Sequence, residues 1–206
     1  MNILAIGAHP DDIEYGCGGT LLKLRQHEEM LINFFVATDG RYAGGEEVRR
    51  KEQEDALAFL GGNTLYWGGF IDTQLEMGRP LISKIEDAVK DCNPEVIFVN
   101  YPRDDHQDHR ALAEATIVAS RYCKKVLFYE DYTAVNFSPD IYVDIEEVLD
   151  RKVELLKVHR SQVERDYPTG LDIVESTKAV ANFRGFQAKV KYAEGFKSLR
   201  YLLDNI

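Results

Sequence analysis

The sequence predicts an α/β fold, in which a single doubly wound and mainly parallel sheet is flanked by helices. The first observation is that short apolar runs alternate along the chain with longer amphipathic stretches. The second is that no repeat, low-complexity tract or Pro/Gly-rich linker interrupts the 206 residues. Alternating strands and helices form parallel sheets that are covered on both faces. We therefore expect one domain over residues 1–206.

The first half of the pattern is the clearer one. An apolar run predicts a strand over residues 2–7, and residues 18–28 follow as a helix entered through glycines. Residues 30–37 are almost wholly apolar and predict a second strand. Residues 46–60 form a charged amphipathic helix, which a glycine pair at 61–62 ends.

The remaining elements continue the alternation. Further strands are expected over residues 65–67, 95–100, 125–129 and 141–143. Further helices are expected over residues 80–91, 107–122 and 145–158, and the tail from about residue 186 is expected to be helical.

Composition narrows the function classes. The net charge of -10 argues against a nucleic-acid partner or an anionic membrane surface, because both select basic patches. No run approaches 18 apolar residues, so no transmembrane segment is expected. The chain starts with a strand rather than a basic leader, and its three cysteines form no paired motif. These features predict a cytoplasmic protein with free thiols, and they leave homo-oligomerisation open.

Two clusters of histidines and aspartates each follow an apolar run. His9, Asp11 and Asp12 come directly after the first predicted strand. A second cluster, residues 104–109, follows the apolar run at 96–99 and contains two more histidines. Ligands bind at the carboxyl ends of strands in open α/β sheets. Two such ends that carry imidazoles and carboxylates together predict a divalent-metal site.

The residue types also suggest how such a site works. A catalytic zinc site uses three protein ligands and one open position, and His9, Asp12 and either His106 or His109 can supply the three. Asp11 is then free to take a proton from the water that the metal activates. The remaining histidine can donate a proton or polarise the substrate. Spacing alone does not order His106 and His109.

Local structure offers an alternative explanation for each cluster. Proline and aspartate favour turns in their own right, and Asp105 or His106 suits an ordinary helix N-cap. The glycines at 16, 18 and 19 fit close helix–strand packing better than a phosphate-binding loop, because no GxGxxG follows the first strand. Both clusters together favour the metal site.

These residues resemble a known family, the PIG-L/LmbE-like zinc-dependent N-acetylglucosaminyl deacetylases. The N-terminal signature is carried by residues 8–12, Glu14 and residues 18–21, and the H-x-D-H motif by residues 106–109. Residues 49–61, 159–162 and 192–196 also resemble family stretches. The resemblance covers nearly the whole chain and implies a Rossmann-like fold of the LmbE type.

The resemblance also implies roles for single residues. It makes His9, Asp12 and His109 the zinc ligands, Asp11 the general base, and His106 the electrophilic or general-acid histidine. Residues that hold substrate hydroxyls or shape the pocket in this family correspond to Glu14, Arg49, Asp72 and Asp104. Iron(II) or cobalt can replace zinc at such ligands.

Two of the resembling residues have simpler explanations. Arg49 fits a helix-surface ion pair with Glu46 or Glu52, and His159 fits a satisfied, partly buried histidine. A helix N-terminus also disfavours a protonated His106, an effect that the aspartates beside it are expected to offset.

The expected function is hydrolytic removal of the N-acetyl group from a small-molecule amino sugar or glycoconjugate. A metallophosphoesterase on a similar sheet and a non-catalytic sugar-binding module are the alternatives. A phosphoesterase would often hold two metals, and a binding module would have no use for Asp11. The sequence does not name the sugar or its aglycone.

Overall fold

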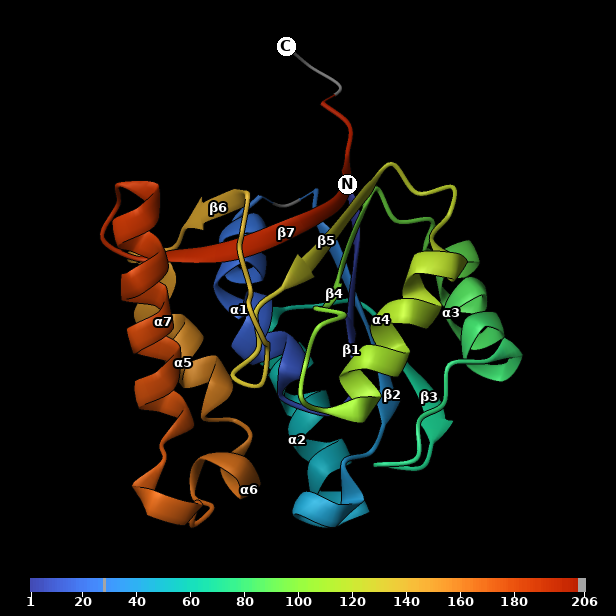
Figure 1. Ribbon diagram of the computed structural model, residues 1–206, viewed down its shortest axis with the longest axis horizontal. Coiled ribbons are helices and arrows are strands. Elements are labelled where there is room, and N and C mark those ends of the chain that lie inside the picture. The colour runs from blue at the N-terminus through green and yellow to red at the C-terminus, as the bar shows by residue number, and fades with distance from the viewer. Residues whose placement is uncertain (28, 204–206) are drawn as a thin grey trace.

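The computed structural model describes residues 1–27 and 29–203, and within this part of the chain seven strands form one sheet (Figure 1). In chain order the strands are β1 (Asn2–Gly7), β2 (Leu31–Thr38), β3 (Leu65–Phe70), β4 (Val96–Asn100), β5 (Lys125–Tyr129), β6 (Ile141–Asp144) and β7 (Ala193–Tyr201). Their spatial order is β3-β2-β1-β4-β5-β7-β6. Strands β1 to β5 are parallel, and β7 runs antiparallel between β5 and β6. The predicted doubly wound, mainly parallel sheet is confirmed.

Helices cover both faces of the sheet (Figure 1). The helices are α1 (Asp12–Leu24), α2 (Glu46–Leu60), α3 (Arg79–Cys92), α4 (Gln107–Ala119), α5 (Leu149–Leu156), α6 (Arg160–Val163) and α7 (Ile173–Ala188). Residues of α1, α2, α5 and α7 pack on one face, whereas α3 and α4 pack on the other. No helix in the described ranges combines the length and apolarity that crossing a membrane requires.

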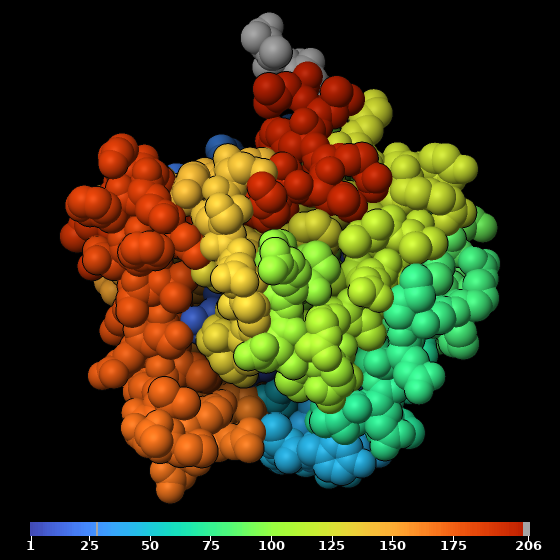
Figure 2. All heavy atoms as spheres, in the orientation of Figure 1, coloured from blue at the N-terminus to red at the C-terminus, as the bar shows by residue number. Residues whose placement is uncertain are grey.

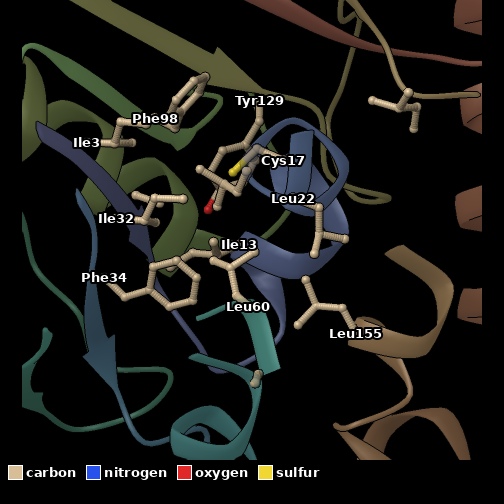
Figure 3. Close-up of a cluster of buried hydrophobic side chains, with 14 of the residues drawn as sticks. Ile3, Ile13, Cys17, Leu22, Ile32, Phe34, Leu60, Phe98, Tyr129 and Leu155 are labelled. Atoms are coloured by element: carbon tan, nitrogen blue, oxygen red, sulfur yellow. The ribbon is translucent and has the colours of Figure 1, made fainter. Parts of the chain in front are cut away.

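The two hydrophobic cores follow from the period-2 alternation of the central strands. In β1, Ile3 and Ala5 join the core beneath α1, whereas Leu4 and Ile6 join the core beneath α3 and α4. Figure 3 shows the first of these cores, where Tyr129 of β5 lies close to Cys17 of α1. Burial on both faces explains why these strands appear in the sequence as nearly continuous apolar runs.

Helix α1 begins at Asp12, six residues before its predicted start, and ends at Leu24. Glycines are poor helix formers, which is why the sequence indicates a later start. Here they serve close packing: a Cβ at Gly16 would lie 2.1 Å from Cδ2 of Tyr129. This agrees with the interpretation of the glycines as packing residues.

The predicted helical tail is wrong. The chain forms α7 earlier, at Ile173–Ala188, and then returns to the sheet as β7, paired with both β5 and β6. Residues 193–201 mix polar and apolar side chains, and only their pairing partners define them as a strand. The helix predicted at 145–158 is also shorter, because a 3-10 turn precedes α5.

Candidate metal and active site

The parallel strands run toward the lower side of Figure 1, and carboxylates follow their carboxyl ends. An aspartate follows each of the five parallel strands within four residues: Asp11 after β1, Asp39 after β2, Asp72 after β3, Asp104 after β4 and Asp131 after β5. The strand order reverses between β1 and β4, so their carboxyl ends flank the crevice where ligands bind in such sheets. Both predicted clusters lie at this crevice.

A tight turn between β1 and α1 presents the first cluster. Asp11 occupies the left-handed region with φ 97°, a conformation that costs a non-glycine residue free energy. Asp12 opens the helix, and its Oδ2 accepts hydrogen bonds from the backbone amides of Ala8 at 2.8 Å and His9 at 3.0 Å. The turn therefore folds back on the Asp12 carboxylate.

The imidazoles of His9 and His109 approach this carboxylate from two sides. Asp12 Oδ2 lies 3.7 Å from His9 Nδ1 and 3.4 Å from His109 Nε2. The opposite ring nitrogens face other carboxylates: His9 Nε2 is 3.1 Å from Asp108 Oδ2, and His109 Nδ1 is 3.1 Å from Asp104 Oδ2. A carboxylate can only accept and the outer contacts are the shorter ones, so a neutral ring carries its proton on the outer nitrogen. The lone pair of each ring then points toward Asp12.

His106 has the opposite arrangement. It is the N-cap of α4, and its Nδ1 accepts the backbone N–H of Asp108 at 3.2 Å. A neutral His106 therefore carries its proton on Nε2. Burial and the nearby His9 and His109 lower the pKa of His106, and the opposing effect of Asp12 and Asp108 is weaker. The aspartates beside His106 therefore do not offset the preference of a helix N-terminus for the neutral ring.

Among the described residues, three sets of side chains bring potential metal ligands within 4.8 Å of one another. They are His9 with His106 and His109, His9 with Asp72 and Asp108, and Asp12 with His109 and Asp131. No one of these sets holds all three predicted ligands: His9 and His109 are in the first, and Asp12 and His109 are in the third. Asp131 adds a carboxylate that the sequence did not single out, and its buried Oδ2 has no hydrogen-bond partner.

Opposite charges dominate the electrostatics around Asp12. Burial raises the pKa of Asp12, but His109 and His9 outweigh this and hold it well below its usual range. Burial likewise lowers the pKa of His109, yet Asp12 and Asp104 raise it to about 10. Burial together with the neighbouring Asp12 and Asp104 raises the pKa of Asp131, although His109 opposes this. Such a concentration of carboxylates attracts positive charge.

Asp11 is held by Arg49, whose guanidinium is buried. Arg49 Nη2 donates to Asp11 Oδ1 at 3.0 Å and to the carbonyl oxygen of Pro10 at 2.5 Å. Burial raises the pKa of Asp11, and the charge of Arg49 opposes that rise. Arg49 pairs with Asp11 rather than in the surface ion pair considered for it, and Glu52 instead accepts the amide and hydroxyl of Ser161. Arg49 thus supports the turn that carries Asp11.

A cavity of about 260 Å3 opens over these residues. It is lined by His9, Asp11, Asp12, Gly40, Tyr42, Ala43, Arg49, Asp72, Thr73, His106, His109, Tyr132, Thr133, Gln162 and Arg165. In Figure 2 the blue segment around residue 42 meets the orange segment around residue 162 at the lower edge of the molecule. Of the four predicted substrate-binding residues, Arg49 and Asp72 line this cavity, and Glu14 and Asp104 do not.

Glu14 and His159 lie beneath the turn, and both side chains are fully buried. Glu14 Oε2 is 3.3 Å from His159 Nε2, and Glu14 Oε1 accepts from Gln53 Nε2 at 2.7 Å. Gln53 in turn accepts the amide of Asp11 at 3.4 Å. Burial lowers the pKa of His159, but Glu14 and Asp11 raise it above its usual value. His159 is therefore more buried than expected and supports the site from below.

Sequence reasoning missed four residues around Asp12: Asn100, Asp108, Tyr129 and Asp131. Asp108 lies inside the second cluster, and its place between the two histidines of the H-x-D-H motif was the available signal. Asp131 follows a strand end, as Asp11 and Asp104 do. Asn100 and Tyr129 end apolar strands and carry no local signal of their own.

The chain is similar to known proteins over most of its length. The model of the family described as PIG-L, GlcNAc-PI de-N-acetylase, matches residues 4–120. The Escherichia coli (strain K12) protein named uncharacterized deacetylase YaiS is 35% identical over 167 residues, covering 77% of this chain and 90% of that protein. A Bacillus cereus protein named probable N-acetyl-alpha-D-glucosaminyl L-malate deacetylase 2 is 32% identical over 186 residues, covering 79% and 84%.

A solved structure extends the likeness to three dimensions. The N,N'-diacetylchitobiose deacetylase from Pyrococcus horikoshii superposes with a TM-score of 0.82 at 25% identity, covering 96% of this chain and 83% of that one. The family match spans more than half of the chain and includes both histidine–aspartate clusters. The chain therefore belongs to the PIG-L family of de-N-acetylases.

Proposed function

We propose that this chain is a zinc-dependent N-deacetylase that acts on an N-acetylated amino sugar or its conjugate. The observation that carries the proposal is the pair of imidazoles of His9 and His109, each with one ring nitrogen facing Asp12 and the other facing a further carboxylate. This carboxylate–histidine arrangement is typical of metal-ligating histidines. The deacetylase names of the relatives support the reaction class.

We assign the cation to His9, Asp12 and His109. Zinc bonds of about 2.0–2.2 Å in a tetrahedron separate neighbouring ligand atoms by about 3.3–3.6 Å. The separation of 3.4 Å between His109 Nε2 and Asp12 Oδ2 falls in that range, and the 3.7 Å between His9 Nδ1 and Asp12 Oδ2 slightly exceeds it. The unpartnered Oδ2 of Asp131 adds a further potential ligand beside Asp12 and His109. His106 fits a ligand less well, because an amide already occupies its Nδ1.

A divalent cation bound there supplies Lewis acidity, which polarises the acetamide carbonyl and lowers the pKa of water. Asp11 lines the cavity and accepts the proton of the attacking water. Arg49 holds Asp11 Oδ1, so Oδ2 remains outside that ion pair. Asp11 then returns the proton to the leaving amine.

His106 stabilises the oxygen on which negative charge develops. Its Nδ1 is fixed by the α4 amide, so the Nε2–H of the neutral ring is the donor. A hydrogen-bond donor that is held in place in this way stabilises the transition state more than the ground state, because the negative charge on the oxygen is larger there. Because its lowered pKa favours the neutral ring, His106 acts as a hydrogen-bond donor rather than as an acid.

Arg49 and Asp72 line the cavity and are the candidates for contact with substrate hydroxyls. For Glu14 and Asp104 we propose supporting roles, since Asp104 orients His109 and Glu14 supports the Asp11 turn through Gln53. Tyr42 and Tyr132 add aromatic surface at the mouth, which suits a sugar ring.

The test is a screen of N-acetylated sugars for release of a primary amine, with metal-stripped protein and zinc-reconstituted protein side by side. We expect amine release that depends on about one zinc per chain, with iron(II) or cobalt able to substitute. Phosphate release from phosphate esters, together with two equally bound metals, would instead favour a phosphoesterase. Tight sugar binding without amine release would favour a binding module.

A further inference from the structure

Asn100 is a fully buried amide at the end of β4, next to the turn that carries Asp12. Its Nδ2 lies 3.2 Å from Asp12 Oδ2, and its Oδ1 lies 3.3 Å from the amide nitrogen of Ala8. The Asp12 carboxylate can only accept and the Ala8 amide can only donate. These two neighbours therefore fix which way round the Asn100 amide lies.

Tyr129 supports this amide from the next strand. Its hydroxyl lies 2.9 Å from Asn100 Oδ1 and 2.8 Å from the carbonyl oxygen of Ile6, and its ring is fully buried in the core of Figure 3. Both of these neighbours are acceptors, so the phenol is the donor in this group. The chain of contacts thus runs from β5 through β4 to the first residue of α1.

Asp12 Oδ2 has three N–H donors: the amides of Ala8 and His9, and the side chain of Asn100. The two amides belong to the same turn and move with it. Asn100 belongs to β4, so its hydrogen bond ties the carboxylate to a different strand. A ligand that is fixed in this way keeps its orientation when the cation leaves.

We propose that Asn100, supported by Tyr129, is a positioning residue that orients Asp12 for the cation. This inference rests on the proposed metal site at His9, Asp12 and His109. Outer hydrogen-bond partners of metal ligands typically contribute about 10–100-fold to metal affinity.

The experiment measures the zinc dissociation constant of metal-stripped protein by competition with a chromophoric chelator. Asn100→Leu keeps a γ-branched side chain and removes the donor to Asp12. The other two partners of Asn100 keep one hydrogen bond each in this variant. The Ala8 amide still donates to Asp12 Oδ2, and the Tyr129 hydroxyl still donates to the carbonyl oxygen of Ile6. We expect about a 10–100-fold weaker zinc affinity. At saturating zinc we expect kcat to recover in large part while KM stays unchanged.

A matched control comes from β2. Asn33 is also buried, and among the described residues its Nδ2 bonds the carbonyl oxygen of Ile3 alone, at 3.3 Å. Asn33→Leu should keep the wild-type zinc affinity, even if it lowers the melting temperature as much as Asn100→Leu does. Tyr129→Phe keeps the ring and should weaken zinc binding by less than Asn100→Leu.

The outcomes separate the inference from the proposed function. If the wild type does not bind zinc, the proposed metal site fails. If the wild type binds zinc and folded Asn100→Leu binds it equally well, the positioning role is overturned. If Asn100→Leu does not fold, Tyr129→Phe decides: weaker zinc binding supports the role, and wild-type affinity overturns it.

Discussion

At the scale of single residues, hydrogen-bond partners distinguish the three histidines of the site. His9 and His109 each place one ring nitrogen on a carboxylate, whereas His106 uses its Nδ1 to accept a helix amide. The partner of the outer nitrogen sets which nitrogen keeps a lone pair. His106 and His109 are the same residue type in the same cluster, so the sequence does not distinguish them. The difference in their protonated nitrogens comes from the partners that the fold gives each ring.

We expect His109→Ala and His106→Ala to fail in different ways. His109→Ala removes a proposed ligand and should lose most zinc affinity. His106→Ala removes a donor and should keep its zinc while turnover falls by about 10²–10³-fold. Zinc content by metal analysis and kcat on the same samples separate the two variants. Zinc loss in the His106 variant alone would reverse the assignment.

Asp11→Asn tests the general base. The amide keeps the shape of the side chain but cannot accept a proton, so turnover should fall by about 10²–10⁴-fold. Zinc content should stay at the wild-type level, because Asp11 is not a proposed ligand. Near-normal kcat in a zinc-loaded Asp11→Asn sample would exclude this role.

At the scale of elements, α1 is held by an ion pair that comes from elsewhere in the chain. Glu194 of β7 accepts the amides of Gly19 at 2.8 Å and Thr20 at 2.6 Å. Lys152 of α5 donates to Glu194 Oε1 at 2.6 Å and to the carbonyl oxygen of Tyr15 at 2.6 Å. Both charged side chains are 4% exposed. Helix α1 is thereby fixed, and with it the position of Asp12.

Glu194→Gln should destabilise the protein strongly. The variant leaves the charge of Lys152 buried without a counter-ion, and loss of one partner of a buried pair costs about 3–5 kcal/mol. Glu146→Gln breaks the exposed pair of Glu146 with Lys191 and should cost at most about 1 kcal/mol. Urea unfolding of both variants at the same pH gives the comparison. Equal stability of the two variants would show that the buried pair is not needed.

At the scale of the whole molecule, the site joins segments that are far apart in sequence. His9 and Asp12 follow β1, and His109 lies about a hundred residues later in α4. A cation bound to all three requires the folded arrangement of β1 and β4, because the unfolded chain offers no such site. Zinc should therefore stabilise the native state by mass action.

Free zinc at 100 times its dissociation constant should contribute about 2.7 kcal/mol. For a chain of this size that corresponds to an increase in melting temperature of about 5–10 °C. His27→Ala, which removes an exposed histidine away from the site, should keep this increase. His109→Ala should lose it. Differential scanning fluorimetry with and without zinc measures both, and an equal increase in the two variants would contradict the ligand assignment.

Much of the fold could be predicted because its signals are local. Apolar runs and amphipathic stretches placed β1, β2, β4, β5 and α2 within a residue or two. The same signals placed both histidine–aspartate clusters at strand ends, where parallel strands bring them to one edge of the sheet.

Two elements were misjudged for a common reason. The glycines of α1 disfavour a helix locally, yet Gly16 is needed where the ring of Tyr129 packs against it, 113 positions later. Strand β7 has no clear pattern, and it forms because β5 offers an unpaired edge. In both cases a partner far away in the sequence outweighs the local preference.

The sequence by itself therefore determined the α/β class and the two clusters at the switch point, because hydrophobic periodicity and residue type are properties of neighbouring residues. Only the tertiary structure decided which histidine nitrogen keeps a lone pair, that Asp131 and Asn100 reach the same carboxylate, and that β7 completes the sheet. Asn100 and Asp131 lie far from Asp12 in the sequence, and β6 lies far from β7, so these contacts exist only once the chain has folded. The partners of His106 and His109 lie within five residues, but spacing leaves the side-chain orientations open and the folded turn fixes them.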